Sequence, residues 1–321
     1  MGLRPNADRY FEEGFALGAD PLPDETQAGF VARLAERQNG YTTRSLFAKL
    51  GLGPPTNRFY EEAARGLAKL AGTSVERIRA TTLGPPGADA ADFRGRRLPL
   101  RMFDLFGTKW RRACPLCLQE SLHHRCWWDV QVASACPVHG LSLVDHCPRC
   151  SEPLRWLGHG VGRTGCVCNV DIRSLTTPPI SEDERSGVAL LHGFLGHEPF
   201  ADVAAEAQSR PPFADLDDSS SADFMIRFAL DLLGRRSKRF SAVGSLDFAR
   251  QGHRGLAIVV AATSDWPGSF HAALDGIRRS LNPEQPPTPS KVTAPMRVWV
   301  DGLPDNQGRL LAEAVNAWMR Q

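Results

Sequence analysis

Hydrophobic positions in the first hundred residues recur at helical spacing in four short stretches separated by glycine-containing turns. Phe30 and Leu34 belong to an apolar stripe that predicts a helix beginning near Asp24 and ending before Asn39-Gly40. Further helices are expected over residues 43–50, 57–70 and 74–80. Short helices joined in this way predict either a helix-turn-helix-like unit or a generic small helical bundle, and the pattern favours neither.

Two of these helices carry capping residues in the sequence. Either Thr42 or Thr43 is expected to cap the second helix. Thr73, with Glu76 three positions later, has the pattern of a capping box for the fourth helix.

Helical periodicity returns in the second half of the chain, after the Pro178-Pro179 pair. Helices are expected over residues 181–196, 221–236 and 267–280, and at the C-terminus around residues 310–318. Residues 215–223, DLDDSSSAD, are predicted to form an exposed polar loop, and 282–290 a linker or extended loop. The apolar run 257–262 fits either a buried helix or a strand.

Composition is that of an ordinary soluble globular protein, with 321 residues, 42% hydrophobic and 23% charged, and a formal net charge of +2. The sequence has no apolar run long enough for a membrane span and no signal peptide at its start. A cytoplasmic location without a membrane partner is therefore expected. In that reducing compartment, clustered cysteines indicate metal binding or redox chemistry in preference to disulfides.

All eight cysteines of the chain lie between Cys114 and Cys168. In order, seven of them form Cys-x2-Cys, Cys-x2-His, a second Cys-x2-Cys and a closing Cys-x-Cys. A two-residue gap lets a knuckle turn present both ligands to one ion, and four protein ligands leave no position open for a substrate. Two structural zinc ions are therefore expected, one held by Cys114, Cys117, Cys136 and His139, the other by Cys147, Cys150, Cys166 and Cys168.

The thiols and histidines of this segment are also compatible with other roles. Redox chemistry at one Cys-x2-Cys pair requires a βαβ context, which the pattern lacks. Cys126 is left over and is expected to be a buried thiol, with replacement of a ligand in the first site as the alternative. Nearby histidines are expected to face solvent or to support the ligands by hydrogen bonds; they are His123, His124 and His146.

Basic residues concentrate at 94–112, where seven Arg or Lys stand against one Asp. Such side chains neutralise phosphates, although a solvated or ion-paired face would look the same. DNA contacts are predicted for Arg94, Arg96, Arg97, Arg101, Lys109, Arg111 and Arg112, with a second basic cluster at Arg235, Arg236, Lys238 and Arg239. No phosphate-binding loop, His-Glu-x-x-His motif or nucleophile elbow is present, so an enzyme is not expected.

Several of these segments resemble one family. CPLCLQES and RCWWDVQVASACPVHGLSLVDHCPRC resemble the signature of the TniQ family of transposition proteins, in which Cys-Pro-x-Cys-Leu precedes a Trp-containing helix and a Cys-x2-His-Gly segment. Residues 21–40 are similar to the family's opening helix, with Glu25-Thr26 where Glu-Ser is usual, and residues 70–83 to its next landmark. Residues 264–274, SDWPGSFHAAL, resemble its later helix-turn-helix segment.

The resemblance implies a target-selection adaptor of cut-and-paste transposition, a DNA-binding protein without catalytic activity. Such an adaptor links a target, recognised directly or through an RNA-guided complex, to an AAA+ ATPase that recruits the transposase. The resemblance also implies the same eight zinc ligands, although the Cys166-x-Cys168 closure departs from a symmetrical scheme. The alternatives are a zinc-stabilised protein-interaction scaffold or transcriptional regulator, and a thiol redox switch. A homodimer is compatible with paired helix-turn-helix units.

The sequence thus predicts a mainly α-helical protein with a small zinc-stabilised irregular or β module. Three domains are expected: a helix-turn-helix-like domain at 1–110, a tandem zinc-finger module at 111–178 and a C-terminal helical domain at 179–321.

Overall fold

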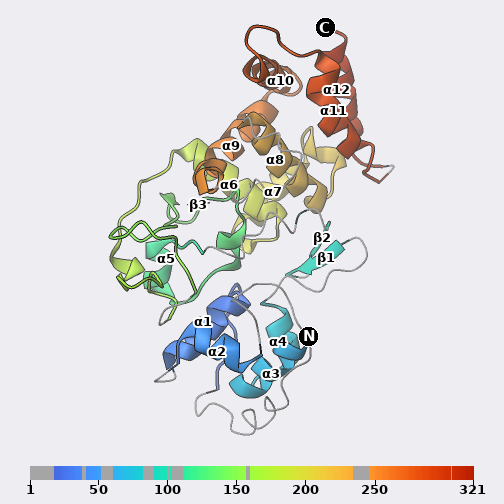
Figure 1. The fold of residues 1–321 in the computed structure, drawn as a ribbon. Helices are drawn as coiled ribbons and strands as arrows, with labels where there is room; N and C mark the ends of the chain where they lie inside the picture. The colour runs from blue at the N-terminus through green and yellow to red at the C-terminus, as the bar shows by residue number, and fades with distance from the viewer. Residues whose placement is uncertain are drawn as a thin grey trace. The chain divides into compact units, whose positions relative to one another are not determined.

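The computed structural model describes most of the chain, namely residues 18–37, 41–51, 61–81, 90–94, 96–99, 102, 111–156, 160–233, 246–304 and 306–321. The chain separates into two compact units, Met1–Pro179 and Ile180–Gln321. The described residues are mainly helical, with little β structure (Figure 1). The mainly α-helical class expected from the sequence is therefore confirmed.

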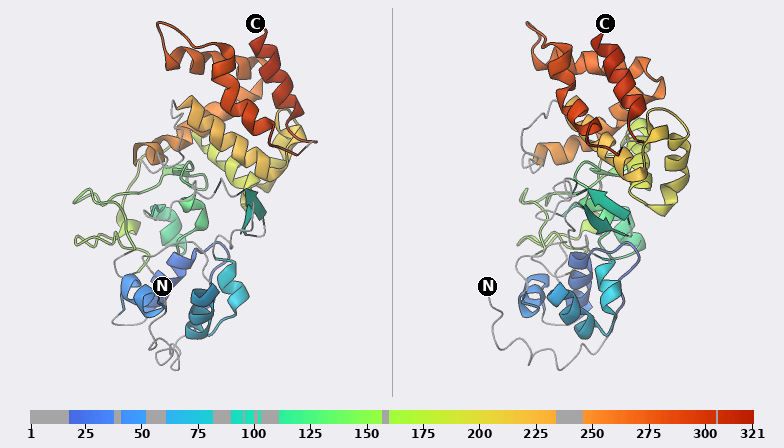
Figure 2. Two further views of the ribbon diagram at one scale, coloured as in Figure 1. Left: turned by 45° about the vertical axis from the view of Figure 1, so that its right-hand side comes forward. Right: turned by 90° about the vertical axis from the view of Figure 1, so that its right-hand side faces the viewer.

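Four short helices open the first unit, and Figure 2 shows them grouped together in both views. They are α1 (Gln27–Arg37), α2 (Thr43–Lys49), α3 (Glu61–Ala71) and α4 (Val75–Arg79). These helices occupy the stretches in which the apolar periodicity predicts them. The expected start of the third helix, near residue 57, lies outside the described residues.

Helix α2 begins with a reciprocal cap. The Thr42 hydroxyl accepts a hydrogen bond from the Ser45 backbone N–H at 3.0 Å, and the Ser45 hydroxyl accepts one from the Thr42 N–H at 2.8 Å. This arrangement satisfies two of the backbone donors that a helix start leaves without partners. Thr42 is therefore the cap, of the two threonines that the sequence offers.

The cap predicted for α4 is wrong. Ser74, not Thr73, precedes the helix, and its hydroxyl accepts from the Arg77 backbone N–H at 3.3 Å. The Thr73 hydroxyl instead donates to the carboxylate of Asp20. The helix begins one residue later than the spacing from Thr73 to Glu76 implies, because the contact with Asp20 holds Thr73 outside it.

The strands form two small antiparallel hairpins. One pairs β1 (Ala90–Phe93) with β2 (Arg96–Pro99), and the other pairs β3 (Ala135–Cys136) with β4 (Leu141–Ser142). In the first hairpin Phe93 lies opposite Arg96, so the turn has two residues. This hairpin was not predicted, because a stretch so rich in arginine shows no alternation of apolar and polar positions.

One hydrophobic cluster joins the helices of the first unit to its cysteine-rich segment. Phe30 of α1 and Phe47 of α2 are buried in the same cluster as Cys114, Trp128 and Trp156 of the cysteine-rich segment. The helical segment and the cysteine-rich segment therefore share the apolar area that stabilises them. The domain border expected between residues 110 and 111 lies within this compact unit.

The second unit consists of helices throughout its described residues (Figure 1). They are α6 (Glu182–Phe194), α7 (Ala201–Gln208), α8 (Asp218–Leu232), α9 (Leu246–Ser264), α10 (Gly268–Leu281), α11 (Pro289–Val300) and α12 (Arg309–Met319). The ambiguous run 257–262 lies in α9 and is therefore helical. Helix α11 begins inside the segment predicted to be a linker and was not foreseen.

The exposed loop predicted at residues 215–223 is wrong. Helix α8 begins at Asp218, because the Asp217 carboxylate caps it by accepting from the Ser220 N–H at 2.7 Å. Asp223 is fully buried, and its carboxylate accepts a hydrogen bond from the Trp299 indole at 2.6 Å. A run of polar residues can thus contain a buried carboxylate when a buried N–H group donates a hydrogen bond to it.

No helix in the described part of the chain has the length and apolar character needed to cross a membrane.

Candidate metal centres

Four of the predicted ligands converge in the first unit and are called cluster 1: Cys114, Cys117, Cys136 and His139. Cys114 directly precedes helix α5 (Pro115–Glu120), and Cys117 lies in the first turn of that helix. Cys136 ends β3, and His139 lies in the tight turn that leads to β4. A helix start and a hairpin turn therefore supply two ligands each.

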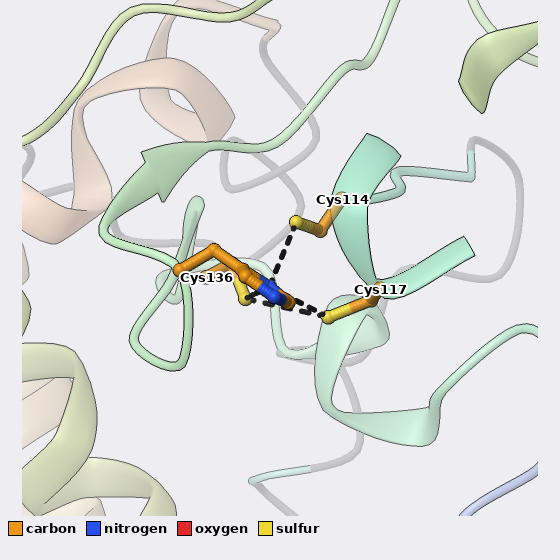
Figure 3. A group of neighbouring side chains, drawn as sticks. Cys114, Cys117 and Cys136 are labelled. Carbon is orange, nitrogen blue, oxygen red and sulfur yellow. Dashed lines mark hydrogen bonds between the residues drawn. The ribbon is translucent and has the colours of Figure 1, made fainter. Parts of the chain in front are cut away.

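The geometry of cluster 1 matches one tetrahedral zinc ion. The His139 Nδ1 atom lies 3.5, 3.3 and 3.6 Å from the sulfurs of Cys114, Cys117 and Cys136. The Cys117 and Cys136 sulfurs are 3.6 Å apart. Ordinary zinc bond lengths require about 3.6 Å between nitrogen and sulfur and about 3.8 Å between sulfurs. In Figure 3 the three cysteine side chains point toward one another.

The ionisation of the thiols in cluster 1 also favours binding of a cation. Cys114, Cys117 and Cys136 are at most 2% exposed. The hydrogen bond with Cys117 lowers the pKa of Cys114, and the same contact raises the pKa of Cys117. Buried sulfurs this close cannot all ionise without a compensating charge. A divalent ion would supply that charge, and the donor set is one that zinc prefers.

Glu120 supports the imidazole of this cluster. The His139 Nε2 atom donates to the Glu120 carboxylate at 2.9 Å, which leaves Nδ1 to face the sulfurs. A carboxylate behind a ligating histidine fixes its tautomer and ring orientation. The sequence analysis missed Glu120, although its position three residues after Cys117 places both on one side of α5.

The other four predicted ligands also converge and are called cluster 2: Cys147, Cys150, Cys166 and Cys168. Their sulfur atoms all lie within 4.8 Å of one another. Cys147 is buried, Cys150 is exposed, and Cys166 and Cys168 are half-buried. Four thiolates at this spacing suit one tetrahedral zinc ion, so cluster 2 could hold a second ion.

Left-handed backbone shapes the turns of cluster 2. Ser151 has a φ of 57°, and its N–H closes the first turn on the Cys147 carbonyl at 2.9 Å. Gly165, with a φ of 76°, precedes the second turn, and a Cβ atom there would lie 2.2 Å from the Arg155 carbonyl oxygen. Glycine is required at 165 because any side chain would collide with backbone.

The remaining thiol and histidines of the segment stand apart from both clusters. Cys126 is buried, as the sequence predicts, and burial raises its pKa. The three nearby histidines pair with carboxylates: His123 with Asp24, His124 with Asp129, and His146 with Asp145. His123 and His124 are buried, so these two do not face solvent.

Arg111, a predicted DNA contact, lies inside the protein. Its guanidinium donates to the backbone carbonyls of Val161 and Arg163 and lies over the Trp156 ring, 4.6 Å from the ring centroid. Burial lowers the pKa of Arg111 to about 10, so the side chain stays charged at neutral pH. The Arg111 side chain therefore holds the irregular segment that leads to Cys166.

Arg112 is held in the same way. Its guanidinium donates to the carbonyls of Trp128, Val130 and Gln131 at 3.1, 2.7 and 2.9 Å. The residue is 6% exposed, and burial lowers its pKa to about 10. Both guanidinium groups are used within the fold, and Arg111 and Arg112 are therefore not available to phosphate in this structure.

Three other predicted DNA contacts lie on the first hairpin, namely Arg94, Arg96 and Arg97. Arg94 occupies its turn with a φ of 56° and lies over the Trp127 ring, 5.5 Å from the centroid. Arg97 is exposed on the opposite strand. The remaining predicted basic residues lie outside the described residues: Arg101, Lys109, Arg235, Arg236, Lys238 and Arg239.

A half-buried carboxylate just before α1 links that helix to the cysteine-rich segment. Asp24 accepts from His123 Nε2 at 2.6 Å and from the Arg125 guanidinium at 2.8 Å. Burial alone would raise the pKa of Asp24, but these two donors outweigh it and hold that pKa well below its usual range. The Asp24 carbonyl also accepts from the Cys126 N–H at 2.8 Å.

These features define a mainly helical protein in which two four-ligand cysteine clusters, one of them set in a helical core, could each bind a metal ion. The family model TniQ matches residues 16–143 of the 321 residues. The match contains cluster 1 and ends before Cys147, the first residue of cluster 2. No curated protein matches the chain. The TniQ domain associates the protein with transposition and with target selection.

Proposed function

We propose that the protein is a non-enzymatic target-selection adaptor of a cut-and-paste transposon, acting in the cytoplasm. The TniQ domain over residues 16–143, with cluster 1 in its core, carries this proposal. The adaptor binds DNA or an RNA-guided targeting complex and recruits an AAA+ ATPase, which in turn brings the transposase. It needs no reactive group of its own, because each step is a binding event.

Zinc in this proposal is structural. Cys114, Cys117, Cys136 and His139 would hold one ion, and the four cysteines of cluster 2 the other. Bound zinc would neutralise the thiolates and cross-link the turns that carry them. With four protein ligands each, the sites keep no position for a substrate. Elemental analysis of protein purified without chelator should find two zinc ions per chain, and a value near zero would contradict the assignment.

Direct DNA binding would use the basic β1–β2 hairpin together with helices α1–α4, whose helix-turn-helix character stays a prediction. Duplex affinity should fall steeply as salt concentration rises. The slope of the logarithm of the binding constant against the logarithm of the salt concentration measures the phosphate contacts. Substituting Arg96 and Arg97 by alanine should reduce this slope by about 1 for each phosphate contact removed. Arg149, which is exposed on cluster 2, offers a matched control in Arg149→Ala. Absence of duplex affinity at low salt would exclude direct binding.

A scaffold that contacts proteins alone, including a transcriptional regulator, is the second candidate. The burial of Arg111 and Arg112 favours it, because two of the seven predicted basic contacts are not free to bind phosphate. Co-purification from the native host separates the candidates. An adaptor should retain an AAA+ ATPase in a nucleotide-dependent way, whereas a scaffold of another pathway should retain none. Light scattering of the same preparation shows whether the protein is a homodimer.

A further inference from the structure

The two clusters differ in their access to solvent. In cluster 1 the three cysteines belong to the hydrophobic core and are at most 2% exposed. In cluster 2 only Cys147 is buried, while Cys150 is exposed and Cys166 and Cys168 are half-buried. Val167, between Cys166 and Cys168, is fully exposed. Three of the four cysteines of cluster 2 therefore lie at the surface of the protein.

Exposure to solvent determines which cysteine thiolates can react with a dissolved oxidant. Oxidation of cysteine by a peroxide requires a thiolate that the oxidant can approach, and buried sulfurs are inert. A resolving thiol must also lie nearby for the product to become a disulfide. Cluster 2 meets both conditions, because Cys150 is exposed and the other three sulfurs lie within 4.8 Å of it.

We propose that cluster 2 is a peroxide-responsive thiol site, which releases its metal on oxidation while cluster 1 keeps its own. The Cys150 thiolate attacks hydrogen peroxide, the O–O bond breaks, and hydroxide leaves with the electron pair to give a sulfenic acid. A thiolate of the facing turn, from Cys166 or Cys168, then attacks that sulfur and displaces a second hydroxide. Two protons from solvent convert the hydroxides to water, so two thiolates lose two electrons and one peroxide becomes two waters.

Loss of two thiolates leaves the second ion with two ligands, too few for tight binding. The rest of the unit has other support. Cluster 1 lies in the shared core, and Arg111 holds the carbonyls of residues 161 and 163 independently of the metal. Cluster 2 also lies beyond the residues that match the TniQ family. Oxidation therefore changes the segment around residues 147–168 and leaves the core folded.

The test uses the full chain, purified with both zinc ions under reducing conditions and then freed of reductant. Hydrogen peroxide is added, released zinc is followed with a chromogenic chelator, and oxidised cysteines are mapped by differential alkylation and mass spectrometry. We expect one of two zinc equivalents to leave at least about tenfold faster than the other, with Cys150 and one facing cysteine oxidised. Dithiothreitol and zinc should restore the original metal content.

Two variants separate this chemistry from unfolding. Cys150→Ser should abolish the fast release, while Cys126→Ser, which removes a buried thiol outside both clusters, should retain it. Far-ultraviolet circular dichroism should be nearly unchanged after the fast phase. Release of both ions at one rate, oxidation of cluster 1 cysteines first, or zinc missing from cluster 2 of the reduced protein would each overturn the proposal. The inference depends on the assignment of metal ions to the clusters and not on the adaptor role. Failure of the adaptor proposal would therefore leave this inference intact, and the reverse is also true.

Discussion

The carboxylate of Glu120 lies 2.9 Å from Nε2 of His139, on the side of the imidazole ring opposite the three sulfurs of cluster 1. This contact fixes the tautomer in which Nδ1 is free to bind a metal ion. A ligand held in its binding orientation loses less entropy when the ion arrives.

Removing this carboxylate should weaken zinc binding at cluster 1. We expect Glu120→Ala to lower the zinc affinity of that site by about 10- to 100-fold, and Glu120→Gln by less, because the amide keeps an acceptor. Competition with a chelator of known affinity measures the effect. Glu313→Ala, which removes an exposed carboxylate of α12, should leave both affinities unchanged. Equal zinc binding by Glu120→Ala and the native protein would show that the contact is incidental.

Arg112 should matter to stability rather than to DNA binding. Its substitution by alanine leaves the carbonyls of Trp128, Val130 and Gln131 without their donor in a buried place. We expect the free energy of unfolding to fall by about 3 kcal/mol or more. Arg112→Lys should recover little, because one ammonium cannot replace the planar fork of a guanidinium. Urea denaturation followed by circular dichroism measures both.

The exposed Arg149 again offers the control, and Arg149→Ala should change the free energy of unfolding by less than about 0.5 kcal/mol. A stable Arg112→Ala variant with weakened DNA affinity would contradict this interpretation, since it would show that the side chain reaches phosphate.

Asp24 should make stability depend on pH in the acid range. Its pKa is held low in the folded state, so it contributes stability above its unfolded pKa of about 3.9, and that contribution is lost as the pH falls toward the folded value. Asp24→Asn should therefore cost about 1–3 kcal/mol at pH 7, and the difference from the native protein should shrink below about pH 4.

Denaturation of both proteins across this pH range measures the difference, and acid release of metal is common to the two. Asp202 of α7, which is exposed, offers a control, and Asp202→Asn should change the free energy of unfolding little across this range. A difference for Asp24→Asn that stays constant from pH 7 to pH 3 would mean that the carboxylate is not the source of the stability.

Features that depend on neighbours in sequence could be predicted. The stripe through Phe30 and Leu34 marks α1, and the Cys-x2-Cys and Cys-x2-His spacings give both groups of ligands that the structure brings together. In the helix, and within each pair of ligands, the relevant residues lie within a few positions of one another, so the sequence itself contains the local geometry.

Features that depend on distant partners could not be predicted. Arg111 binds a carbonyl 50 residues away, and Asp24 meets His123 at a separation of 99 residues. The run 215–223 looked like a loop because its polar residues are satisfied from outside, Asp223 by Trp299 at a separation of 76 residues. A count of charges along the chain therefore cannot distinguish an arginine that faces solvent from a buried arginine that donates to backbone carbonyls.

Gly187 of α6 sits against the backbone of α9, and this contact gives a test of the second unit. A Cβ atom at 187 would lie 2.7 Å from the carbonyl carbon of Leu256 and 2.8 Å from the nitrogen of Ala257, so Gly187→Ala must push the two helices apart. We expect a loss of about 1–3 kcal/mol in the free energy of unfolding. At Gly276 of α10, no other part of the described chain comes within 4 Å of the Cβ position, and Gly276→Ala should instead gain up to about 1 kcal/mol. Thermal denaturation of both variants measures the contrast, and similar effects at the two glycines would mean that α6 and α9 do not pack this closely.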